Sequence, residues 1–232
     1  MVASCEHFLD EKPNKRLIIP ETLPALPARL DNFSVINNND PGAGEISADD
    51  YYLTDTDWAS LSQEGHRRLY TWEKDQLFAP QSNEWGLVYR NVYYANTVLE
   101  GVAGIPKTAA NTPQWNSVKG QALFTRAKAF LQTAVNWSVA YDPATAVAAL
   151  GIPLRLSTDF NAVSTRASLQ HTYDRIIADL KEAIALLPDR EVHVMRPSRP
   201  AADALLARTY LAMGRYELVE AYADSSLRHH SA

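Results

Sequence analysis

Aromatic and acidic side chains gather in one stretch of the first third of the chain. Asp49, Asp50 and Tyr51 are consecutive, and Trp72 follows in the same stretch. An indole ring can stack on the apolar face of a sugar, while carboxylates and amides bind the sugar hydroxyls. This composition allows a carbohydrate-binding surface. The residues predicted to contact the ligand are Asp49, Asp50, Tyr51, Trp72 and Asn83.

The same carboxylates allow two other functions. Paired carboxylates can act as general acid and base on a glycosidic bond, or they can hold calcium. However, the chain contains no twelve-residue calcium loop, none of the common nucleophile or nucleotide motifs, and no histidine spacing typical of zinc ligands. We therefore expect no catalytic residue, metal or cofactor. A helical enzyme acting on glycans through Asp49, Asp50 or Asp55 stays open as an alternative.

The tryptophans fall into two classes. Trp85, Trp115 and Trp137 lie on helical apolar stripes, which predicts that they pack in the core. Trp72 lies where the apolar periodicity is weak, so packing rules do not demand it there. The alternative for Trp72 is a ring that plugs a loop onto the helices.

The only cysteine, Cys5, ends the sequence Val2-Ala3-Ser4-Cys5. Small residues before a cysteine are typical of the end of a bacterial lipoprotein signal, although the apolar part of such a signal is missing here. We expect Cys5 to be the lipidation site, with an ordinary N-terminal cysteine as the alternative.

The composition describes an ordinary globular protein. The 232 residues are 46% hydrophobic and 21% charged, with a net charge of -5. A protein that binds the nucleic-acid backbone needs a basic face, so we expect no nucleic-acid partner. Because no run of 18 apolar residues occurs, we expect membrane attachment only through a lipid anchor.

Apolar periodicity predicts an all-α fold in residues 83–232 and an irregular wrapping segment in residues 1–82. The long helices are predicted at 83–103, 112–138, 172–187, 200–213 and 216–228. Shorter helices are predicted at 23–33 and 55–70, and a loop at 141–167. Thr112 and Ser168 are the expected N-caps, and Gly214 the left-handed turn between the last two helices.

The last two helices have the residue spacing of a tetratricopeptide repeat. The positions that match are Leu206, Ala207, Tyr210, Gly214 and Tyr216. A small residue lets the two helices approach, and the large residues fill the space between them. The match is partial, because Val219 stands at a usual alanine and Ser231 at the usual closing proline. A tetratricopeptide-type scaffold that binds only protein is therefore a second alternative.

A series of motifs carries a family resemblance. In chain order they are Phe8-Leu9-Asp10-Glu11-Lys12-Pro13 after Cys5, Ala48-Asp49-Asp50, Tyr70-Thr71-Trp72, Trp85-x-x-x-Tyr89-x-x-x-Tyr93-x-x-Asn96-x-x-Leu99-Glu100, Gly120-Gln121-Ala122-Leu123-Phe124-Thr125-Arg126-Ala127, Gly151-Ile152-Pro153-Leu154, Arg166-Ala167-Ser168 and Arg199-Pro200-Ala201-Ala202. This series resembles the N-terminal half of the SusD-like (RagB/SusD) nutrient-binding outer-membrane lipoproteins.

The resemblance implies a helical protein with tetratricopeptide-like hairpins and no catalytic activity. It implies that a lipidated Cys5 anchors the protein on the outer face of the outer membrane. It also implies capture of a glycan or another nutrient for a SusC-like TonB-dependent transporter, the expected partner. Residues 1–232 would form the family's N-terminal domain, and its C-terminal half, which supplies much of the ligand site, would be absent.

Overall fold

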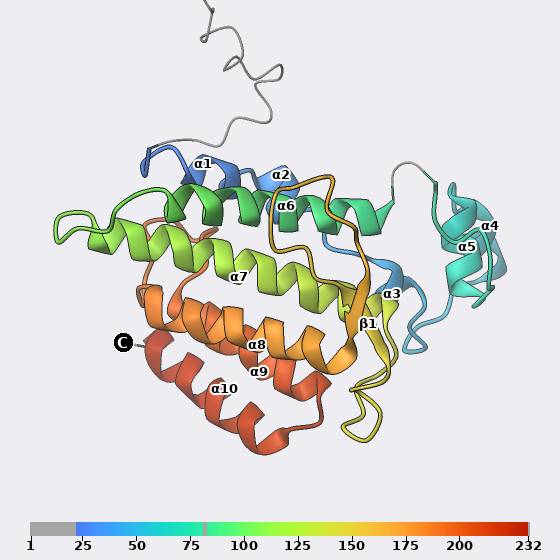
Figure 1. The fold of residues 1–232 in the computed structure, drawn as a ribbon. Helices are drawn as coiled ribbons and strands as arrows, with labels where there is room; N and C mark the ends of the chain where they lie inside the picture. The colour runs from blue at the N-terminus through green and yellow to red at the C-terminus, as the bar shows by residue number, and fades with distance from the viewer. Residues whose placement is uncertain (1–21, 81–82, 232) are drawn as a thin grey trace, which may run out of the picture.

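The computed structural model describes residues 22–80 and 83–231. Five long helices contribute nearly half of the residues in this part of the chain (Figure 1). They are α6 (Glu84–Ala103), α7 (Thr112–Trp137), α8 (Leu169–Leu186), α9 (Arg199–Ala212) and α10 (Tyr216–Ser231). The all-α fold predicted from the apolar periodicity is confirmed.

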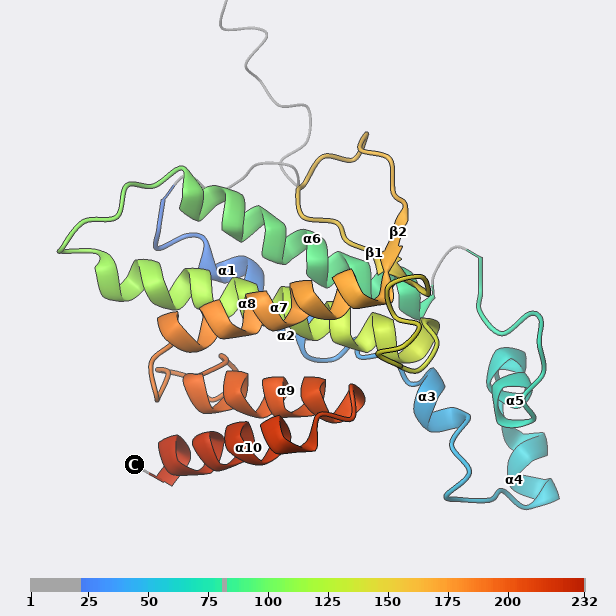
Figure 2. The same cartoon turned by 60° about the horizontal axis from the view of Figure 1, so that its bottom comes forward.

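Helix α7 is the central element. It packs against α6 on one side and against α8 and α9 on the other, so its sequence is apolar on more than one face. Phe130, Ala127 and Ala134 of α7 are buried in the main core, together with Ile176 of α8 and Leu206 of α9. Successive helices cover one another in layers from α6 to α10 (Figure 2).

Helices α9 and α10 form the predicted hairpin. Gly214 has a φ of 69° between them, a conformation that glycine adopts without a steric penalty. Ala207 is buried, as the close helix contact requires, and the rings of Tyr210 and Tyr222 stack with centroids 5.6 Å apart. The expected tetratricopeptide-like packing is present.

Residues 22–80, the described part of the wrapping segment, contain five short helices: α1 (Pro27–Leu30), α2 (Phe33–Ile36), α3 (Ala43–Ile46), α4 (Asp55–Ser60) and α5 (Glu64–Tyr70). The predictions of one helix at 23–33 and one at 55–70 were wrong, because each range is interrupted. Asn32 has a non-helical backbone before α2, and Gln63 is extended before α5. Helices α1 and α2 cover α6, whereas α4 and α5 lie beyond its first turn (Figure 1).

Two local predictions need correction. Residues 141–167 are not all loop, since β1 (Leu150–Pro153) pairs with β2 (Arg166–Ser168) as an antiparallel ribbon. Thr112 does not cap α7, because Asn111 is its N-cap residue and the Thr112 hydroxyl donates to the Thr108 carbonyl at 2.7 Å. Ser168 caps α8 as predicted by accepting a hydrogen bond from the His171 amide, although α8 begins at Leu169.

Candidate functional site

The structure brings four of the five predicted ligand residues into one region. Asp49, Asp50 and Tyr51 follow α3, and all three are exposed. Trp72 follows α5, and its Nε1 donates to the carbonyl of Ser47 at 2.8 Å. This hydrogen bond brings the indole to the backbone just before Asp49. We call Asp49, Asp50, Tyr51 and Trp72 the aromatic surface.

Trp72 does not plug a core. Trp72 is 66% exposed. Its backbone φ of 56° is uncommon for a residue other than glycine. The hydrogen bond to Ser47 holds the edge of the indole, so the exposed ring has a defined position. A fixed and exposed ring is what stacking on a sugar needs, because little side-chain entropy is lost on binding.

Tyr51 is fixed in a comparable way. Its hydroxyl donates to the Ile46 carbonyl at 2.7 Å, and its ring lies 5.8 Å from that of Tyr70. The Tyr70 hydroxyl accepts a hydrogen bond from the Leu53 amide at 2.8 Å. Tyr70 therefore ties the segment after α3 to α5, and this tie positions the aromatic surface.

Asn83 has a different environment. It is the N-cap of α6, where its Oδ1 accepts from the Gly86 amide at 3.0 Å and its Nδ2 donates to the Ala79 carbonyl at 2.9 Å. Both ends of the amide are therefore used by the local backbone. A contact of Asn83 with ligand stays a prediction.

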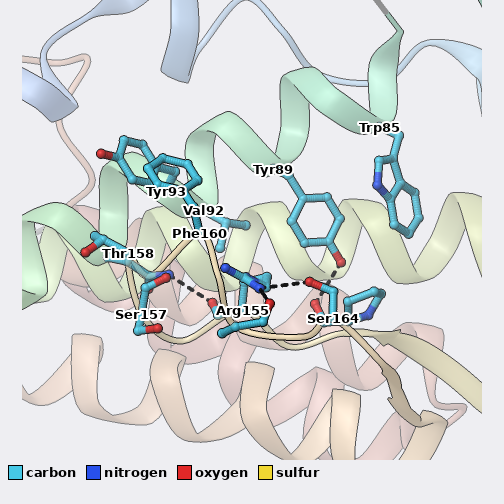
Figure 3. Close-up of a pocket in the computed structure, with 12 residues that line it drawn as sticks. Trp85, Tyr89, Val92, Tyr93, Arg155, Ser157, Thr158, Phe160 and Ser164 are labelled. Carbon is cyan, nitrogen blue, oxygen red and sulfur yellow. Dashed lines mark hydrogen bonds between the residues drawn. The ribbon is translucent and has the colours of Figure 1, made fainter. Parts of the chain in front are cut away.

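The structure also contains a pocket that we did not predict, between α6 and the loop 154–165 that joins the two strands (Figure 3). We call it the α6 pocket; its volume is about 350 Å³. Trp85, Tyr89 and Tyr93 line it from α6, and Phe160 from the loop. The four-residue spacing of the three α6 rings, which places them along one side of a helix, was the sequence signal for this pocket.

The prediction that Trp85, Trp115 and Trp137 are core residues was only partly right, since each is half-buried. Trp85 lines the α6 pocket and meets Trp137 edge to face, with centroids 5.4 Å apart. The Trp115 Nε1 donates to the Ile105 carbonyl at 3.1 Å. An indole is too large, and its N–H edge is too polar, to be fully buried within a narrow apolar stripe.

Three side chains of α6 fasten the loop wall of the pocket. The Tyr89 hydroxyl donates to the Pro153 carbonyl at 2.8 Å, and Asn96 Nδ2 donates to the Arg155 carbonyl at 2.9 Å. The Glu100 carboxylate accepts from the amide and the hydroxyl of Thr158 at 2.8 and 2.6 Å. Burial raises the pKa of the Tyr89 phenol, which keeps this donor protonated.

Two further features bear on the expected chemistry. Within residues 22–80 and 83–231, no three His, Cys, Asp or Glu side chains converge as a metal site would require. Among the helices of this part of the chain, none combines the length and apolar character needed to cross a bilayer. Cys5 lies outside the described residues, so its lipidation stays a prediction.

Solved structures with the same fold are numerous, with twenty-seven significantly matching chains. A SusD superfamily protein from Bacteroides vulgatus has a TM-score of 0.75 at 19% identity, covering 91% of this chain and 48% of its own. One from Bacteroides thetaiotaomicron has a TM-score of 0.70 at 19% identity, covering 89% and 46%. A laminarin binding SusD-like protein has a TM-score of 0.58 at 21% identity, covering 86% and 41%.

At these identities the structures establish the fold, and the chain spans about half the length of each or less. None of the curated proteins matches the sequence significantly. The SusD-like family model described as "Starch-binding associating with outer membrane" matches residues 7–211. The chain therefore belongs to the SusD-like family.

Proposed function

We propose that this protein binds carbohydrate at the cell surface and holds it without chemical change. The observation that carries the proposal is Trp72, an indole that is 66% exposed and yet held by its hydrogen bond to Ser47. Membership of a family described as starch-binding and the printed name of the laminarin binding relative support the same ligand class.

The aromatic surface suits a sugar chain. The face of Trp72 stacks on the C–H face of a pyranose ring, and the Tyr51 ring extends the apolar contact. The exposed carboxylates of Asp49 and Asp50 accept hydrogen bonds from sugar hydroxyls. Each contact is modest, so a ligand that spans several sugar units gains affinity by engaging several of them.

The test is a titration of laminarin- and starch-derived oligosaccharides by calorimetry. Trp72→Ala should weaken binding about five- to thirtyfold, the loss of about 1–2 kcal/mol of stacking. Its melting temperature should stay near that of the wild type, because the ring is exposed. Tyr216→Ala removes a ring of α10 that is 69% exposed and is the matched control. Equal affinities of Trp72→Ala and the wild type would reject the aromatic surface.

The same sugars separate the alternatives. Cleavage detected in a reducing-end assay would support the enzyme if Asp49→Asn, Asp50→Asn or Asp55→Asn abolished it. Failure to bind any glycan on an array, together with binding of a protein partner, would support the tetratricopeptide-type scaffold. Binding without turnover supports our proposal.

The proposed location is the outer face of the outer membrane, with Cys5 as the lipid anchor and a SusC-like TonB-dependent transporter as partner. In this arrangement residues 1–232 form the N-terminal domain of a longer protein. A fatty-acid analogue should label the native protein and fail to label Cys5→Ala. The transporter should copurify from membranes with the wild-type protein. Equal labelling of Cys5→Ala, or no copurification, would contradict the respective part of the proposal.

A further inference from the structure

We propose that the α6 pocket is a second sugar site, which takes a mono- or disaccharide. This inference rests on the proposed carbohydrate-binding function but concerns a different place from the aromatic surface. The volume of about 350 Å³ lies near the lower end of the range of small-molecule sites, about 300–1,000 Å³. That size suits one or two sugar units better than a long chain.

The two walls of the pocket differ in chemistry, as the two sides of a sugar ring do (Figure 3). One wall carries the rings of Trp85, Tyr89 and Tyr93 from α6. Phe160, which is 69% exposed, adds a fourth ring 5.1 Å from that of Tyr93. The loop wall adds the hydroxyl groups of Ser157, Thr158 and Ser164. Aromatic faces bind the C–H side of a pyranose, and hydroxyls bind its polar edge.

The pocket is held open before any ligand enters. Exposed aromatic rings are driven to close on one another, because this removes apolar surface from water. Here the loop is fastened to α6 at the carbonyls of Pro153 and Arg155 and at Thr158. The Arg155 guanidinium also donates to the carbonyls of Asp159 and Ala162, which stiffens the loop itself. Such preorganisation lowers the entropy cost of binding.

The hydrogen bonds that hold the loop continue into the core through Asn96. Asn96 is 1% exposed, and its Oδ1 accepts from Arg126 Nη1 at 3.0 Å while its Nδ2 holds the loop. Arg126 is paired in turn with the fully buried Asp179. Because Asn96 is buried, moving the loop away would leave its Nδ2 without the Arg155 and Ser157 carbonyls, at a cost of about 1–3 kcal/mol. The pocket wall is therefore a rigid part of the fold.

The charge of the lining disfavours a cationic ligand. No acidic side chain lines the pocket within the described residues, so a cation gains nothing there. Arg155 is the one charged lining residue, and its guanidinium donates to the loop carbonyls and to the Ser164 hydroxyl at 2.9 Å. These hydrogen bonds fix the guanidinium within the loop, and the hydroxyl groups of the same wall supply the polar contacts that a sugar needs.

The test is a calorimetric titration of maltose and of laminaribiose into the full 232-residue chain and its variants. Phe160→Ser should weaken binding of the preferred disaccharide about five- to thirtyfold. It should remain folded, because Phe160 is exposed on a loop. Phe33→Ser changes an exposed phenylalanine of α2, outside the pocket, and is the matched control. Trp72→Ala should bind the disaccharide as the wild type does.

A second readout locates the ligand directly. In amide NMR spectra, disaccharide should shift the signals of Ser157 and Thr158 in the wild type and in Trp72→Ala. No disaccharide binding, or equal affinity of Phe160→Ser and the wild type, overturns the pocket proposal. If the pocket proposal fails but Trp72→Ala binds oligosaccharide more weakly than the wild type, the proposed carbohydrate-binding function stands. Weaker disaccharide binding by Phe160→Ser, together with wild-type oligosaccharide affinity of Trp72→Ala, supports the pocket and rejects the aromatic surface.

Discussion

Arg126 and Asp179 form a two-point ion pair in the interior of the protein, where α7 meets α8. Arg126 Nε lies 2.8 Å from Asp179 Oδ2, and Nη2 lies 2.9 Å from Oδ1. The same carboxylate accepts a further hydrogen bond from Arg175, one turn before it on α8. One pair thus connects two core helices and, through Asn96, the wall of the α6 pocket.

Breaking this pair should strongly destabilise the fold. Asp179→Asn removes the negative charge and leaves the Arg126 guanidinium buried without its counter-ion. We expect the free energy of unfolding to fall by about 3–5 kcal/mol in urea denaturation. Glu182→Gln is the matched control, because Glu182 pairs with Lys119 across the same two helices at the surface. That change should cost less than about 1 kcal/mol. Similar losses in both variants would contradict the assignment.

Two helical glycines should respond to alanine with opposite signs. A Cβ at Gly120 of α7 would stand 2.8 Å from Cγ of Leu187, which is buried at the end of α8. Overpacking of this kind costs about 1–3 kcal/mol, more than the gain of about 1 kcal/mol in helix propensity. A Cβ at Gly86 of α6 meets only Asn83 Oδ1, at 3.8 Å. Thermal unfolding should therefore show Gly120→Ala less stable, and Gly86→Ala more stable, than the wild type.

The two roles considered for Asn83 can be separated by substitution. Asn83→Ala removes the N-cap of α6 and should lower the free energy of unfolding by about 1 kcal/mol. Asn83→Ser keeps a capping oxygen and should recover most of that stability, but it lacks the amide. If Asn83 contacts the ligand as predicted, Asn83→Ser should still bind oligosaccharide more weakly than the wild type. Wild-type affinity of Asn83→Ser would restrict Asn83 to capping.

Alkaline pH should destabilise the protein through its buried tyrosines. Burial raises the pKa of Tyr89, and also those of Tyr173 and Tyr210. An unfolded phenol ionises near pH 10. Above that pH the unfolded chain releases protons that the folded chain retains, so the free energy of unfolding falls as pH rises. Below pH 10 both states hold these protons, and this contribution is constant.

Tyr89→Phe tests this linkage. At pH 8 the variant should be about 1 kcal/mol less stable than the wild type, because it lacks the hydrogen bond to Pro153. At pH 11 the difference should vanish or slightly reverse, because the wild type loses about 1.4 kcal/mol that the variant, which has no phenol at this position, does not lose. Urea denaturation at both pH values gives the comparison. A difference that does not change with pH would refute the linkage.

The long helices could be predicted because their signals are local. The apolar spacing and the Asn83 position located α6 to within a residue, and Gly214 marked the turn into α10. The strands β1 and β2 could not be predicted in this way. They are short, and each is stabilised mainly by pairing with the other across an intervening loop.

Part of the candidate site could also be predicted from residue type. Trp72 and Tyr51 were singled out because no helical packing rule explained them, and both are exposed. Their grouping could not be predicted, since the hydrogen bond from Trp72 to Ser47 joins residues far apart in the sequence. The α6 pocket was missed for the same reason. Its rings were visible as a four-residue spacing, but its second wall is a distant loop.

The sequence by itself determined the long helices and the family, because helical periodicity, capping residues and ordered motifs are properties of neighbouring residues. Only the tertiary structure decided which side chains meet. Asn96 looks like any polar residue on an apolar helix until the fold brings Arg126 to its oxygen and the Arg155 carbonyl to its amide. A buried amide must find such partners, and only the complete packing arrangement determines which residues supply them.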